Sequence, residues 1–138
     1  MLRVSNRLFQ DLADEAFNEL VKSHHLEDMK DVFITWRHRP TAQQSAPLEA
    51  GPGQQPRLLL GIYEGVPATM RWQRFATPLL PSKITLFKDN ILAVVGDDFG
   101  KLRYQIKKTL WHEIAHHMGL DHDQIHQLEE NCLARHPI

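Results

Sequence analysis

The residues best suited to chemistry lie in one stretch, His112 to His122, which reads H-E-x-x-H-x-x-G-x-x-H. On a helix, His112 and His116 are four residues apart and share a face, so both imidazoles can reach one cation. Glu113 follows about 100° around the axis, where its carboxylate can contact a water on that cation without becoming a ligand. This spacing predicts a metal site, and a chance match to the whole pattern is far rarer than one to its first five positions.

His122 is the expected third ligand. Gly119 can adopt positive φ, so it can end the helix and turn the chain back toward the metal. Three imidazoles with an open fourth position are typical of catalytic zinc, whereas structural sites are closed and usually contain cysteine. Asp121 and Asp123 could also bind a metal in principle. In an extended chain, however, both point away from the metal if His122 points toward it.

Composition limits the classes of protein that fit this chain. Its 138 residues suit one core, and we expect a single domain over residues 1–138. The formal net charge of −1 predicts no nucleic-acid partner, and the single cysteine, Cys132, excludes an internal disulfide. The chain begins without the apolar region of a signal peptide and has no apolar run long enough for a membrane span. We therefore expect a cytoplasmic protein with no membrane partner.

Three strands are predicted. Residues 31–36 are rich in β-branched and aromatic side chains, and residues 57–64 form a near-continuous apolar run that favours a central, buried strand. Residues 82–87 alternate and follow two prolines, which favours an edge strand. Between the first two strands, residues 40–56 are rich in Pro, Gln, Gly, Ala and Ser, and we expect a flexible internal loop there.

Helices are predicted over residues 5–23 with Ser5 as N-cap, over 90–95, and from Asp97 or Asp98 to about Met118. A short helix is expected after Asp123. The helix that carries the motif should bury one stripe made of Leu102, Ile106, Leu110 and Ile114. Beside that stripe, Gln105, Thr109, His112 and His116 should face a cleft. Four basic residues of the same helix are expected to form a solvated face rather than a binding patch: Lys101, Arg103, Lys107 and Lys108.

Three segments resemble the small zincin-like metallopeptidases of the minimal zincin type: residues 59–67, residues 83–87 and residues 109–123. Within the first, Gly-Ile-Tyr-Glu-Gly-Val-Pro points to this group in particular. The resemblance implies a small α+β fold, in which a mixed sheet packs on an N-terminal helix and an active-site helix. It also implies Zn²⁺ as cofactor and a peptide or protein substrate that adds to the 83–87 edge as an extended strand. Relatives often carry Asp where this chain has His122, and no methionine follows to form a Met-turn.

Together, the motif and the resemblance predict peptide hydrolysis by a zinc-activated water, with Glu113 as general base. Tyr63 or Tyr104 could stabilise the oxyanion, although a packed core position is the more common role of a tyrosine.

Two other functions fit parts of the motif. Endoribonucleases of the rRNA-maturation type carry a similar H-x-x-x-H-x-x-G-x-D-H, which residues 119–122 match in part. Those enzymes lack a glutamate after the first histidine, so Glu113 favours a peptidase. The second alternative is a non-catalytic zinc-binding module. The sequence leaves the oligomeric state open.

Overall fold

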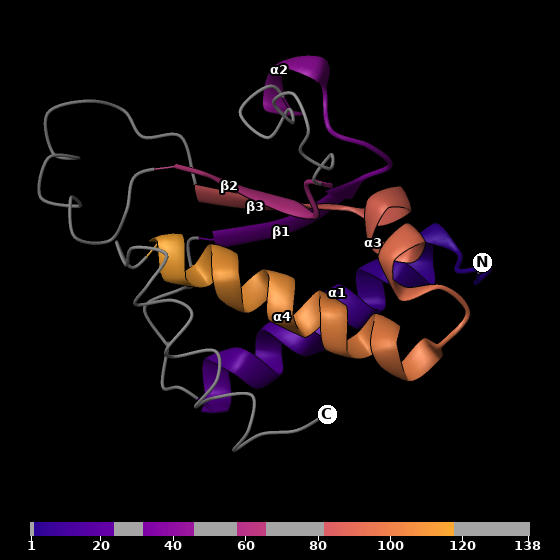
Figure 1. Ribbon diagram of the computed structural model, residues 1–138. Helices are drawn as coiled ribbons and strands as arrows, with labels where there is room; N and C mark the ends of the chain where they lie inside the picture. Colours follow the sequence, from indigo (N-terminus) through magenta and orange to yellow (C-terminus); the bar gives the residue numbers. More distant parts are fainter. Residues whose placement is uncertain (1, 24–31, 46–57, 66–81, 118–138) are drawn as a thin grey trace, which may run out of the picture.

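A three-stranded sheet and two long helices that cross beneath one of its faces form two layers (Figure 1). The computed structural model describes residues 2–23, 32–45, 58–65 and 82–117. The elements are α1 (Asn6–Ser23), β1 (Val32–Arg37), α2 (Ala42–Ser45), β2 (Gly61–Glu64), β3 (Ser82–Phe87), α3 (Lys88–Val95) and α4 (Phe99–His117). This is the mixed α+β architecture that the sequence predicted.

The sheet has the order β1-β3-β2, with β1 parallel and β2 antiparallel to β3. Ile84 of β3 therefore lies between Ile34 of β1 and Tyr63 of β2. In the described sheet, β3 is the central strand and β2 lies at an edge. The sequence predicted the reverse order, with the 57–64 strand central and the 82–87 strand at an edge, and that prediction is wrong.

The apolar run of residues 57–64 suggested a central strand, but only its second half, Gly61–Glu64, is a strand. Leu58 is 52% exposed, and the sheet pairing begins at Gly61. In β3, by contrast, two of the polar side chains that suggested an exposed face, Ser82 and Thr85, are small and buried. A short hydroxyl can be accommodated in the interior when it finds a hydrogen-bond partner.

The caps predicted for the two long helices are confirmed. Ser5 Oγ accepts a hydrogen bond from the backbone N–H of Leu8 at 3.0 Å, at the start of α1. Val4 and Phe9, on either side of this cap, are both buried in the core. At the start of α4, Asp98 Oδ1 accepts from the N–H of Lys101 at 3.1 Å. These bonds fix where each helix begins.

The core lies between the sheet and the two helices. The stripe predicted for α4 is confirmed, because Leu102, Ile106, Leu110 and Ile114 are all fully buried. The other members that are buried almost completely include Phe9 and Leu20 of α1, Ile84 and Leu86 of β3 and Ile91 of α3. One side of α4 is therefore enclosed by three other elements.

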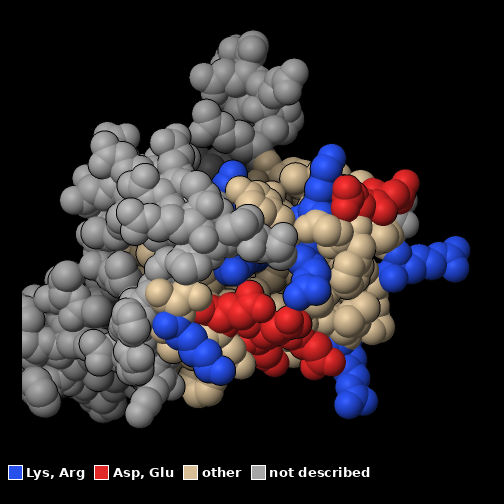
Figure 2. Space-filling model, turned by 90° about the horizontal axis from the view of Figure 1, so that it is seen from below, with Lys and Arg blue, Asp and Glu red and all other residues tan. Residues whose placement is uncertain are grey.

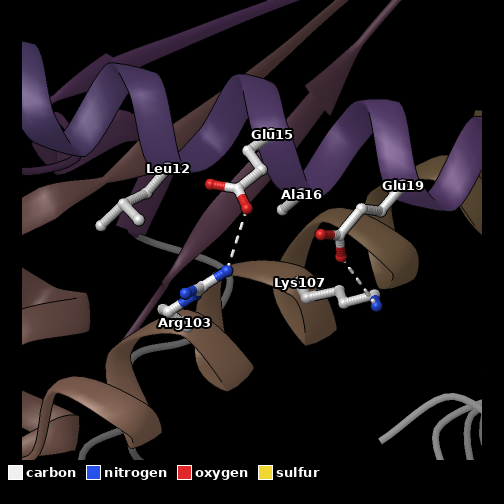
Figure 3. Close-up of a pocket in the computed structure, with 6 residues that line it drawn as sticks. All are labelled: Leu12, Glu15, Ala16, Glu19, Arg103 and Lys107. Carbon is white, nitrogen blue, oxygen red and sulfur yellow. Dashed lines mark hydrogen bonds and ion pairs between the residues drawn. The ribbon is translucent and has the colours of Figure 1, made fainter. Parts of the chain in front are cut away.

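Charged side chains join α1 to α4 at the surface of this core. Viewed from the helix side, acidic side chains gather in the middle of the face with basic ones around them (Figure 2). The Arg103 guanidinium lies 2.9 Å from Glu15 Oε1, and Lys107 Nζ lies 3.2 Å from Glu19 Oε2 (Figure 3). Lys107 is only 6% exposed, so the prediction of a uniformly solvated basic face is wrong at this residue.

The segment expected to be a loop from residue 40 begins with an ordered turn. Thr41 Oγ1 accepts from the N–H of Gln44 at 3.1 Å, and Gln44 Oε1 accepts from the N–H of Thr41 at 2.9 Å. This reciprocal pair caps α2, a single turn on the side of the sheet opposite α1 and α4 (Figure 1). Residues 46–56 and the short helix expected after Asp123 lie outside the described residues. No described helix combines the length and the apolar character needed to cross a membrane.

Candidate metal site on helix α4

The last two turns of α4 bring two imidazoles and one carboxylate together. The possible ligand atoms of His112, Glu113 and His116 all lie within 4.8 Å of one another. The two imidazole rings are 4.8 Å apart between centroids, with their planes at 72°. His112 and His116 are partly exposed, whereas Glu113 is buried. The three residues whose spacing predicted a metal site thus form one cluster.

The position of this cluster is set by the core. Leu110 and Ile114, on either side of His112 in the sequence, are fully buried and so fix the rotation of α4 about its axis. A helix held in this way presents its polar side chains in a fixed geometry, which a binding site requires. The core therefore fixes the backbone positions from which both imidazoles extend.

Glu113 is only 8% exposed, and its burial alters its acidity. Desolvation raises the pKa of this carboxyl from 4.5 to about 7, and a hydrogen bond from the backbone N–H of Tyr63 acts in the opposite direction. In the metal-free protein the side chain is therefore close to half protonated at neutral pH. The same hydrogen bond ties the carboxylate of α4 to strand β2.

A cleft of about 340 Å³ opens beside His112 and Glu113. This volume is in the range of sites that bind small ligands or single side chains. One wall is the segment Leu59–Gly61, and the other is the face of α4 formed by Gln105, Lys108, Thr109, His112 and Glu113. Of the four α4 residues predicted to face a cleft, three line it and His116 does not. Lys108 and Glu113 line it in addition, which the sequence did not predict.

Gly61 sets the closeness of β2 to α4. A Cβ at this position would lie 2.8 Å from Thr109 Cγ2 and 3.3 Å from the backbone oxygen of Thr85. Thr109 is buried and β-branched, so its methyl group cannot turn away easily. The sequence reasoning missed this role, although a glycine within a strand is a recognised sign of close backbone approach.

Neither tyrosine considered for the oxyanion lines the cleft. The Tyr63 hydroxyl lies 3.2 Å from Ser82 Oγ, and its ring packs against the core. Tyr104 is 40% exposed. Tyr63 instead contributes to the site through its backbone N–H. The predicted third ligand, His122, lies outside the described residues, as do Gly119, Asp121 and Asp123.

A family model of zincin-like metallopeptidases matches residues 29–132, which is well over half of the chain. The chain belongs to this family. A search of curated proteins finds no match. Membership implies a metal ion, usually zinc, and a peptide substrate. The donor set on α4 fits zinc, because imidazole nitrogens are common zinc ligands and a buried carboxyl stands next to them.

In this zincin-like metallopeptidase, we expect Gly61→Ala to lower the free energy of unfolding by about 1–3 kcal/mol, because the added methyl group collides with Thr109. Thr109→Ser removes the colliding Cγ2 and keeps the hydroxyl that accepts from Gln105 Nε2 at 3.0 Å. The double variant should therefore regain most of the loss. Urea unfolding of both single variants and the double variant measures this coupling. Strictly additive losses would show that the close approach does not limit position 61.

Glu113→Gln should stabilise the metal-free zincin more at pH 8 than at pH 5. The folded-state pKa of about 7 lies above the value of 4.5, so the wild-type protein loses stability as pH rises between these values. Glutamine is neutral throughout and does not pay this desolvation cost. The advantage of the variant should grow by about 2–3 kcal/mol between the two pH values.

Denaturant unfolding in the presence of a chelator measures this difference. Glu64→Gln is the matched control, because Glu64 is exposed on β2. An advantage of Glu113→Gln that is the same at both pH values would show that burial does not raise the pKa of this carboxyl.

Proposed function

We propose that the protein is a zinc-dependent peptidase in which His112, His116 and His122 bind the metal and Glu113 is the general base. The observation that carries this proposal is the buried Glu113 carboxyl, within 4.8 Å of both imidazoles and at the wall of an open cleft. A structural metal site needs no such carboxyl and no adjoining space for a ligand.

Zinc bound at these imidazoles would supply Lewis-acid chemistry, which activates water and polarises the carbonyl of the scissile bond. The role of Glu113 is to accept a proton from the attacking water at a carboxylate oxygen. It then delivers that proton to the amide nitrogen of the leaving group. The backbone N–H of Tyr63 holds the carboxylate in place for both transfers.

Two opposing influences on the pKa of Glu113 suit it both to accept and to donate a proton. Burial raises its pKa to about 7, so that the carboxyl can release a proton as well as accept one near neutral pH. A cation held by the neighbouring imidazoles favours the charged form, which is the form that accepts the first proton. The two influences oppose each other, and together they keep the group usable in both directions.

The substrate peptide is best placed along β2. The family resemblance implied an extended peptide at the edge of the sheet, but the 83–87 strand expected there is the central strand β3. In the described sheet β2 is an edge strand, and its first residue, Gly61, lines the cleft with His112 and Glu113. A strand added beside β2 would thus pass close to the candidate metal ligands.

An RNA hydrolase is less well supported. Of the four basic residues on α4, Arg103 and Lys107 pair with acidic residues of α1. On the face seen from the helix side, basic side chains surround acidic ones instead of forming a continuous positive surface (Figure 2). Phosphate-backbone recognition depends on such a surface. A non-catalytic zinc-binding module is the remaining alternative, and the following experiment separates it from an enzyme.

Glu113→Gln should keep zinc and lose hydrolysis, because the change preserves the shape of the side chain and removes the proton acceptor. Loss of one general base should lower the rate by a factor on the order of 10²–10⁴. The measurement is cleavage of a broad peptide library by zinc-loaded protein, followed by mass spectrometry, with an unstructured RNA as second substrate. Zinc content is determined on the same samples.

Asp11→Asn serves as control, because Asp11 is exposed on α1 and does not line the cleft, so the loss of its charge should leave cleavage unchanged. Cleavage by zinc-loaded Glu113→Gln at the wild-type rate would remove Glu113 from the mechanism. Zinc binding without cleavage of any substrate by the wild-type protein would favour the non-catalytic module.

His122→Ala should weaken zinc binding, whereas Asp121→Ala and Asp123→Ala should keep it. The basis is the sequence alone: Gly119 can turn the chain back, and His122 follows at the spacing of the zincin motif. Zinc stoichiometry and affinity of the three variants measure the assignment. Loss of the metal in Asp123→Ala with retention in His122→Ala would instead indicate two histidines and one carboxylate.

A further inference from the structure

Helix α4 carries three basic residues in its middle turns, and these residues differ in their contacts. Arg103 pairs with Glu15, and the buried Lys107 pairs with Glu19, so both charges serve the contact between α4 and α1. Within the described part of the chain, Lys108 has no hydrogen-bond or ion-pair partner. Its charge is therefore available to a ligand.

Lys108 lies on the cleft side of the helix. It lines the cleft together with His112, one helical turn further along, and Glu113. Four residues of helix correspond to about 6 Å along the axis, and an extended peptide advances about 3.3 Å per residue. A peptide that passes His112 along the cleft therefore brings the positions one or two residues from its scissile bond near Lys108.

The ammonium group of Lys108 differs in charge from most of the other groups that line the cleft. Leu59 and Leu60 are apolar, Gly61 offers only backbone, and the Gln105 amide donates to Thr109 Oγ1 at 3.0 Å. Lys108 is thus the one basic side chain among the described lining residues apart from His112. A positive charge beside apolar walls attracts an anion more strongly than the same charge in open water.

We propose that Lys108 makes this cleft selective for peptides with a carboxylate one or two residues from the scissile bond. The inference rests on the proposed peptidase function and adds the substrate class. Either the side chain of Asp or Glu or the C-terminus of the peptide can supply the carboxylate. An ammonium–carboxylate contact of this kind should favour acidic over matched neutral peptides about five- to tenfold.

The test measures binding to zinc-loaded Glu113→Gln, which does not consume the peptide. The probes are fluorescein-labelled hexapeptide mixtures that are random except at one fixed position, Glu in one mixture and Gln in the other. Each mixture is made with an amidated and with a free C-terminus. Fluorescence anisotropy should show tighter binding of the Glu mixture or of the free-acid form, and the two comparisons identify the source of the carboxylate.

Lys108→Glu on the same background should abolish this preference, and a mixture with Lys at the fixed position should now bind more tightly than the Gln mixture. Lys108→Met should abolish the preference without the reversal. Lys101→Glu is the matched control, because it makes the same change of charge on an exposed position of α4 outside the cleft. A direct contact between carboxylate and zinc would affect all variants equally, so their comparison isolates Lys108.

A carboxylate preference that is absent, or that is equally large in Lys108→Glu, would overturn this inference. The role of Lys108 and the proposed peptidase function can fail independently in these experiments. Hydrolysis without a Lys108-dependent preference would refute only the role of Lys108. A Lys108-dependent preference in a chain that cleaves no peptide would refute only the peptidase.

Discussion

The burial of one side of helix α4 is the constraint on which the rest of this structure depends. Four side chains at helical spacing along α4 are removed from solvent by α1, α3 and the sheet. Each such side chain contributes roughly 1.5–3 kcal/mol when it leaves water. Rotation of α4 would expose several of them together, so the core determines which side of the helix His112 and His116 occupy.

The same helix meets strand β2 at a second contact, and this contact holds the Glu113 carboxylate. Because Gly61 has no side chain, β2 approaches α4 closely enough for the Tyr63 backbone to donate to the carboxylate. This hydrogen bond lowers the pKa of Glu113, whereas the burial of the carboxyl raises it and is the larger effect. The close packing of β2 on α4 thus influences the acidity of Glu113 through the Tyr63 hydrogen bond, and the folding energy of the core offsets the cost of burying the carboxyl.

Much of the helical structure could be predicted from the sequence because its causes are local. Ser5 and Asp98 cap the helices that follow them, and the α4 stripe repeats at intervals of three to four residues. The grouping of His112, Glu113 and His116 follows from helix geometry once that helix is accepted. None of these inferences requires knowledge of what lies across the core.

The order of the strands could not be predicted because it depends on partners distant in the sequence. Alternation in β3 suggested an exposed face, yet Thr85 is covered in the folded chain. Lys107 was expected in solvent, but Glu19, far away in the sequence, lies within reach of its ammonium group. The raised pKa of Glu113 likewise arises from burial in the folded chain, and the hydrogen bond from Tyr63 of β2 acts against it.

These non-local contacts divide α4 into faces with separate tasks. Toward α1 it places Arg103 and Lys107, whose charges are neutralised by Glu15 and Glu19. Toward the cleft it places Lys108, which no described acidic residue neutralises. Adjacent residues of a helix point about 100° apart, so neighbours with the same charge can belong to different environments. The role of each basic residue on α4 therefore depends on the element that it faces. For this reason the basic cluster in the sequence did not reveal that two of its residues contact α1 and that a third lines the candidate substrate cleft.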